Sequence, residues 1–209
     1  MTGWDSSGFG GDPFPVDSGR EEMIELVGPH LRVSGRMALG RFSRLTDLVN
    51  HNRGYVRLHG ATLLRRNGSP TSLVVAELMV NQDEITFIGQ AGGALADDLE
   101  DRDPADDVRM GDSRGPDKAR RRFVVFTPGH AIAGFINVHE EMTLASFVDA
   151  TEPRFVPMTS VTARSLADRR VFSHFAFLLV NRTQMTAVAE ADPGAEVGDL
   201  APEAPEGAG

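Results

Sequence analysis

Two blocks of this sequence align with each other, and this internal similarity constrains the fold more than any single motif does. Met23–Asn50 lies over Arg122–Asp149 without a gap, and after one extra residue near Thr151 the alignment resumes. The pairs of aligned residues that mark the repeat are Gly35 with Gly134, Leu45 with Leu144, Tyr55 with Phe155, and Asn81 with Asn181. Order, spacing and turn residues agree along both blocks. We therefore interpret the chain as a duplicated module, against the alternative of chance similarity between two β-rich segments.

Segments poor in apolar residues lie before, between and after the two blocks. The 209-residue chain has 30 acidic residues, and the segment between the blocks and the last segment hold many of them. Such segments lack the apolar surface that would offset the entropy lost on ordering. We expect a disordered tail at 1–20, module copy 1 at 21–90, an acidic disordered linker at 91–119, copy 2 at 120–190 and an acidic disordered tail at 191–209. The alternative for the linker is a tether that binds a basic partner.

The first half of each block predicts two strands followed by a short helix. Val33, Gly35, Met37 and Leu39 alternate with more polar residues, which is the period of a strand with one wet face. A glycine inside a strand, such as Gly35 or Gly134, marks a bulge or a close backbone approach. The helices are predicted at 43–50 and 142–149. Their expected capping residues are Ser43 and Thr143 at the N-termini and Asn50, in left-handed geometry, at the first C-terminus.

Three further strands complete each block, so the predicted order is β-β-α-β-β-β, twice. In the first block they are expected at 55–66, 73–80 and 84–88, and in the second at 154–165, 171–180 and 184–189. The fold class is thus mainly β with one short helix per module. A module of this size is near the lower limit for independent stability. We therefore expect the copies to pack together, as a pseudo-twofold tandem of small twisted sheets or partly open barrels.

Motifs for catalysis are missing from the sequence. There is no cysteine, which excludes thiolate chemistry and cysteine-ligated metals, and no nucleotide-binding or hydrolase signature. The weak candidate is the cluster His139, Glu140 and Glu141, as a metal site or an acid–base pair. Exposed acidic residues before a helix N-terminus explain it better. We expect no catalytic, metal or cofactor-binding site and no cofactor.

Asn81 and Asn181 are matched asparagines that follow a strand in each copy. We interpret them as turn residues, in left-handed geometry and bonded to their own backbone, and not as ligand contacts. The net charge of −9 argues against nucleic acid, although arginines in the first block leave a phosphate-binding face open. The start of the chain has no targeting pattern, and no apolar run approaches the roughly 20 residues of a membrane span. These features predict a cytoplasmic protein without a membrane partner.

The repeated pattern resembles a family of small β-rich bacterial proteins. Copy 1 reads Gly35-Arg36-Met37, then RLTDLVN at 44–50, then VNQDEI at 80–85, and copy 2 departs from it at Thr143, Ser146 and Asp149. The family modules read G-x-φ, R-L-[ST]-D-φ-φ-N and φ-N-[KQ]-D-x-I, where φ is apolar, and they have no established activity. The resemblance implies two tandem copies and no particular chemistry. The module is also similar to Sm-like and other small barrels, although here the helix lies between strands two and three.

Three functions follow from the sequence. The favoured one is a non-enzymatic binding, scaffold or regulatory protein that acts through protein–protein contacts or self-association, at strand edges or in the groove between the copies. One alternative is a small-barrel protein that binds nucleic acid or nucleotides. The other is an enzyme with an unrecognised site at the module interface.

Overall fold

The computed structural model of the protein describes residues 19–64, 73–90, 117–168 and 171–192. Most of the three segments expected to be disordered lies outside the described residues. One boundary is wrong: Lys118 and Ala119, assigned to the linker, begin a strand. They pair with His139 and Val138, so the ladder extends past the apolar run used to place the boundary.

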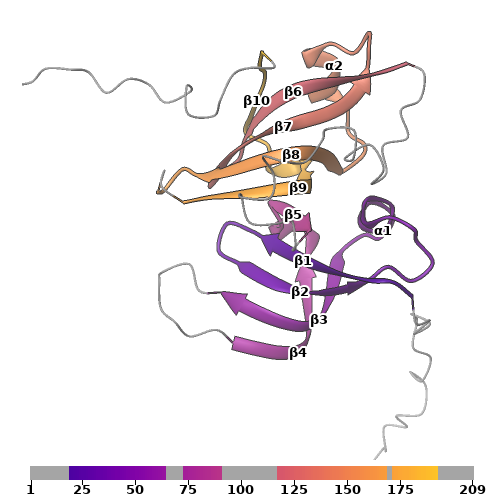
Figure 1. The fold of residues 1–209 in the computed structure, drawn as a ribbon, viewed down its shortest axis with the longest axis vertical. Coiled ribbons are helices and arrows are strands. Elements are labelled where there is room, and N and C mark those ends of the chain that lie inside the picture. Colours follow the sequence, from indigo (N-terminus) through magenta and orange to yellow (C-terminus); the bar gives the residue numbers. More distant parts are fainter. Residues whose placement is uncertain (1–18, 65–72, 91–116, 169–170, 193–209) are drawn as a thin grey trace, which may run out of the picture.

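The described residues form a mainly β fold, as the sequence predicts, with ten strands in one antiparallel sheet. The strands are β1 (Glu21–Val27), β2 (Arg32–Ala38), β3 (Tyr55–Leu64), β4 (Leu73–Asn81), β5 (Phe87–Gln90), β6 (Lys118–Phe126), β7 (His130–His139), β8 (Phe155–Ser165), β9 (Phe172–Asn181) and β10 (Ala187–Glu190). Their order across the sheet is β10-β6-β7-β8-β9-β5-β1-β2-β3-β4 (Figure 1). The sheet therefore ends in β4 on one side and β10 on the other, and β5 joins β9 in its middle.

In each half, one short helix follows the second strand: α1 (Leu45–His51) follows β2, and α2 (Leu144–Asp149) follows β7. Thr143 caps α2 as expected, because its side chain accepts from the backbone N–H of Ser146. The expected caps of α1 are wrong. Arg44 is its N-cap and makes no side-chain capping bond, and the C-terminal turn ends in extended backbone at Asn52.

A single turn of 3-10 helix precedes the last strand of each half, at Gln82–Glu84 and Arg182–Gln184. Both turns occupy residues that the sequence assigns to a loop or to the start of the strand. The last strands therefore begin later than expected, at Phe87 and Ala187.

Gly35 and Gly134 lie where two strands approach closely. The register between β2 and β3 shifts between Ser34 and Arg36, and that between β7 and β8 shifts between Ala133 and Phe135. A Cβ atom on Gly35 would lie 3.3 Å from the Cα of Ala61, which is closer than most Cβ contacts in proteins. The glycines thus keep the bulged strands close to their neighbours.

We expect Gly134→Ala to destabilise the protein by about 1–3 kcal/mol, because the added methyl overpacks this site. It would lie 2.8 Å from Cγ2 of Val161 and 3.1 Å from the backbone oxygen of Thr159. Gly35→Ala is the matched variant with looser contacts and a smaller expected loss. Urea denaturation of both variants measures the difference, and equal losses would contradict this account.

The buried apolar residues form two clusters. Neighbouring strand residues belong to different clusters, Ile88 and Leu179 to one and Phe87 and Leu178 to the other, so the clusters lie on opposite faces of the sheet where β5 pairs with β9. The first is built on residues of the first half, including Ile24, Leu39 and Leu58, and the second on residues of the second half. Each cluster also takes side chains from the other half. Phe155 and Leu179 belong to the first cluster, whereas Val27 and Phe87 belong to the second.

Candidate functional site

The two halves of the sheet meet where β5 pairs with β9, and we call this pairing the join. The two strands run antiparallel, with Phe87 opposite Val180 and Gly89 opposite Leu178. Gly89 leaves room for an aromatic ring, since a Cβ there would lie 2.4 Å from Cε1 of Phe175. The join is therefore a continuous ladder with packed side chains.

Asn181 ties the two halves together with a fully buried amide. Its Nδ2 donates to the backbone oxygen of Gln82 at 3.0 Å and to that of Ile85 at 2.8 Å. Its Oδ1 accepts from the backbone N–H of Thr183 at 3.1 Å and so caps the following 3-10 turn. The backbone is extended at Asn181 and also at Asn81, so the left-handed turn expected at both residues is wrong, while the bond of each side chain to its own backbone is as expected.

A second amide, that of Asn50, crosses the same join at the end of α1. Its Nδ2 donates to the backbone oxygen of Phe155 at 3.0 Å, and its Oδ1 accepts from the N–H of Phe155 at 2.7 Å. The Phe155 ring is fully buried. Asn50 thus fixes the start of β8 and does not terminate the helix in left-handed geometry.

Charged side chains border the join. Arg154 forms an ion pair with Asp83, and Gln184 Nε2 donates to the backbone oxygen of Asp83 at 2.8 Å. Burial lowers the pKa of Arg182, and the nearby carboxylate of Glu152 partly opposes that shift. The guanidinium of Arg182 also donates to the backbone oxygen of Phe147, and this bond anchors the second 3-10 turn to α2.

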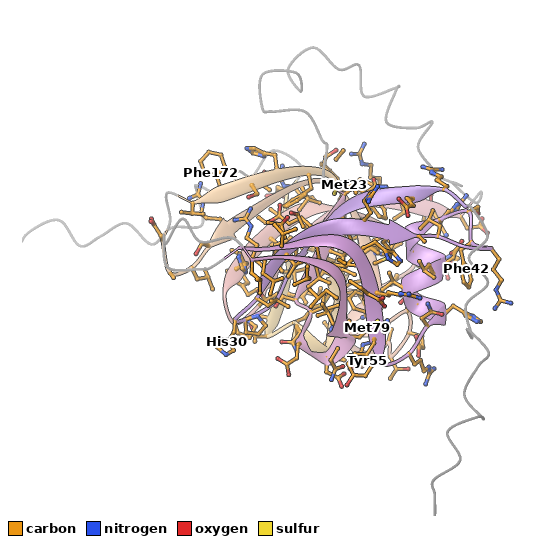
Figure 2. All side chains as sticks on the ribbon, turned by 90° about the horizontal axis from the view of Figure 1, so that it is seen from below. Met23, His30, Phe42, Tyr55, Met79 and Phe172 are labelled. Carbon is orange, nitrogen blue, oxygen red and sulfur yellow. The ribbon has the colours of Figure 1, made fainter. Side chains whose placement is uncertain are left out.

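The outer edge of β4 exposes apolar side chains. The residues concerned, with their exposed fractions, are Leu73 (60%), Val74 (66%), Met79 (47%) and, on the adjoining strand β3, Tyr55 (57%). Tyr55 and Met79 share a face, because Met79 is paired with Arg57 two residues along β3 (Figure 2). Their aligned residues, Phe155 and Leu179, are fully buried in the join.

The other outer edge is β10, which pairs with β6. Arg121 on β6 forms an ion pair with Glu190 at the end of β10. The hydrogen bond that Arg121 donates lowers the pKa of Glu190. Beside this edge, Val148 on α2 is 53% exposed, whereas its aligned residue Val49 is 2% exposed. Both ends of the sheet thus expose residues whose aligned partners are buried.

Asn81 repeats only half of the bonding of Asn181. Its Oδ1 accepts from the N–H of Asp83 at 3.0 Å, in the same capping role. Among the described residues, no hydrogen bond uses its Nδ2, and the side chain lies partly exposed beside the open edge of β4. In the part of the chain that the structure describes, the Asn81 amide therefore has no counterpart to the bonds that the Asn181 amide donates across the join.

His139, Glu140 and Glu141 lie exposed where β7 ends and the turn to α2 begins. Within the described ranges, no group of three or more histidine or acidic side chains could hold a metal ion.

Leu45 lies in the first core cluster, and Leu144 packs against the second. The repeat positions thus contribute to the core and, through Asn181, to the join. Sequence reasoning missed Tyr55, Met79 and Val148, because their signal is exposure in the folded chain.

Several arginines of the first half are paired with carboxylates: Arg20 with Glu22, Arg32 with Glu25, Arg36 with Glu21, Arg53 with Glu152 and Arg57 with Glu77. A hollow of about 490 Å³ on the second half is lined by Arg120, Arg121, Arg122 and Phe135, together with Glu190, Ala191 and Asp192. In the hollow, two carboxylates stand against three arginines, and Arg121 forms an ion pair with Glu190. Carboxylates thus offset part of the positive charge in both places.

Comparison with protein-family models, with curated proteins and with solved structures finds no match for this chain. No helix in the described part of the chain is long and apolar enough to cross a membrane. The function must therefore be inferred from the geometry of the edges.

Proposed function

We propose that this protein is a non-enzymatic scaffold that binds protein partners through its open strand edges. The observation that carries the proposal is the apolar edge of β4, where Tyr55 and Met79 are about half exposed. An unpaired strand edge offers a row of N–H and C=O groups to an incoming strand, and apolar side chains beside it add affinity. Soluble proteins usually protect such edges unless they use them.

We further propose that the two halves are copies of one module. The strand orders β5-β1-β2-β3-β4 and β10-β6-β7-β8-β9 support this, since corresponding strands occupy corresponding places. A twofold axis would pair like strands, whereas the join pairs β5 with β9. Within the proposed duplication the copies are therefore related head-to-tail, in place of the pseudo-twofold tandem expected from the sequence.

Site-specific photocrosslinking in the native host tests the scaffold function. A photoreactive methionine analogue in place of Met79 should give protein adducts, because the proposed contact covers this side chain. The matched control carries a photoreactive group in place of Phe172, which is 54% exposed at the far end of β9. Absence of adducts at position 79, or equal yields at both positions, would refute the proposed function.

A further inference from the structure

We propose that β4 of one chain pairs with β10 of a second copy of this chain, in the same head-to-tail manner in which β9 pairs with β5. This inference rests on the proposed scaffold function and names its partner. In the join, Ile88 is opposite Leu179. Transferred through the alignment, the new pairs are Val80 with Ala187, Met79 with Val188, and Leu78 with Ala189 of the second copy.

The backbone groups on both edges point the right way for this pairing. The N–H of Asn181 donates to the backbone oxygen of Thr86 across the join. Backbone N–H groups alternate in direction along a strand, so the N–H of Leu179, two residues earlier, also faces β5. The aligned Met79 therefore directs its N–H and C=O away from β3. On the other edge, Ala191 donates inward to Arg122, which places the N–H and C=O of Val188 outward. Met79 and Val188 thus offer each other two hydrogen bonds.

The exposed side chains also complement each other. In the join, Phe155 and Leu179 enter the core of the other half, near α1 with its buried Val49. Tyr55 and Met79 are the residues aligned with that pair, and Val148 on α2 is aligned with Val49. All three are about half exposed in the single chain, so one contact covers them together.

The Asn81 amide fits the same contact. Asn181 Nδ2 donates to the backbone oxygens of Gln82 and Ile85 across the join. The residues aligned with these acceptors are Arg182 and Met185. In the proposed assembly, Asn81 Nδ2 donates to these two oxygens of the second copy, and its Oδ1 keeps the capping bond to Asp83.

The two edges lie at opposite ends of the sheet, so one chain presents both complementary surfaces (Figure 1). A head-to-tail contact adds copies until a ring closes or a fibre grows. Ring closure leaves no unpaired edge, and closed symmetry is the rule for soluble oligomers. We therefore expect a cyclic assembly of a single finite size.

Three aligned differences make the contact between chains weaker than the join. Glu77 stands at the position of Phe177, Ala187 at that of Phe87, and Asp149 at that of Asn50. The edge then buries less apolar surface, and Asp149 can accept from Tyr55 but cannot donate to it. We expect an assembly that forms reversibly with protein concentration.

Complementary edge blocks test the proposal by native mass spectrometry and sedimentation of the full-length protein. Met79→Pro blocks β4 and Val188→Pro blocks β10, and neither removes an N–H that serves the chain's own ladder. Each variant alone should remain monomeric, because every copy lacks the same edge. An equimolar mixture should form a one-to-one heterodimer, through β10 of Met79→Pro and β4 of Val188→Pro. The wild type should form a larger cyclic species. Homodimers of a single variant would indicate like-with-like edges and overturn the proposal, as would a monomeric wild type.

Asn81→Asp keeps the test decisive if the prolines prevent folding. It retains the capping oxygen but loses the amide donor, so the assembly should weaken at least tenfold while the circular dichroism spectrum stays unchanged. Phe172→Lys is the control: Phe172 is 54% exposed on β9, away from both β4 and β10, and the change should leave assembly intact. Unchanged assembly in Asn81→Asp would count against the proposal. Photocrosslinks from position 79 to other proteins, with a monomeric wild type, would leave the scaffold function standing and remove only self-association.

Discussion

Replacing Asn181 by aspartate is expected to lower the free energy of unfolding by about 3–5 kcal/mol. The side chain is fully buried, and its Nδ2 supplies two hydrogen bonds to backbone oxygens of the other half. A carboxylate in its place loses both donors and turns a buried negative charge toward two carbonyl oxygens. The loss is a large share of the 5–15 kcal/mol that is typical of a folded domain, so urea denaturation will show it clearly.

Asn81→Asp is the control for this prediction. It makes the same chemical change at the aligned position, where the side chain is partly exposed and only Oδ1 has a partner among the described residues. We expect a change in the free energy of unfolding within about 0.5 kcal/mol under dilute conditions. Similar losses in both variants would mean that the bonds across the join do not carry the stability assigned to them.

These asparagines also show how far the sequence could predict the site. The alignment identifies them as matched residues that bond their own backbone, and the structure bears this out through Asp83 and Thr183. The partners of Asn181 Nδ2 could not be predicted. Gln82 and Ile85 come next to it only because β5 pairs with β9, and the local pattern does not record which edges pair.

The strands were predictable because apolar alternation is a local property, and most of the predicted ranges match the observed ones within a few residues. The 3-10 turns at Gln82–Glu84 and Arg182–Gln184 were missed since they are short and held by a side-chain cap. The cap of α1 was wrong for a related reason. This helix is held by packing of Leu45, Leu48 and Val49, and so it does not need a bond from Ser43.

Exposure separates the join from the open edges, and sequence patterns do not measure exposure. Val49 and Val148 occupy the same place in the alignment, yet one is buried and the other is half exposed. α1 contacts β8 of the other half, whereas α2 contacts β10 of its own half. Repeat positions thus become candidate contact residues only when the topology shows which copy has a neighbour.

Phe155→Ala is the second change for which we expect a large effect, a loss of about 3–5 kcal/mol in the free energy of unfolding. The ring is fully buried in the core cluster of the other half, and α1 holds the backbone of Phe155 through Asn50. Truncation to alanine leaves a cavity at the join, because the surrounding strands are fixed by their ladders and relax only in part. Thermal and urea denaturation measure the loss.

Tyr55→Ala is the matched variant, since Tyr55 is aligned with Phe155 and is 57% exposed in the single chain. Its expected effect on unfolding is within about 0.5 kcal/mol at concentrations where the chain is monomeric. At higher concentrations it should weaken the assembly, because the ring then enters the core of the next copy as Phe155 enters its own neighbour. A large loss of monomer stability in Tyr55→Ala would place this ring in the chain's own core and contradict its role as a contact between copies.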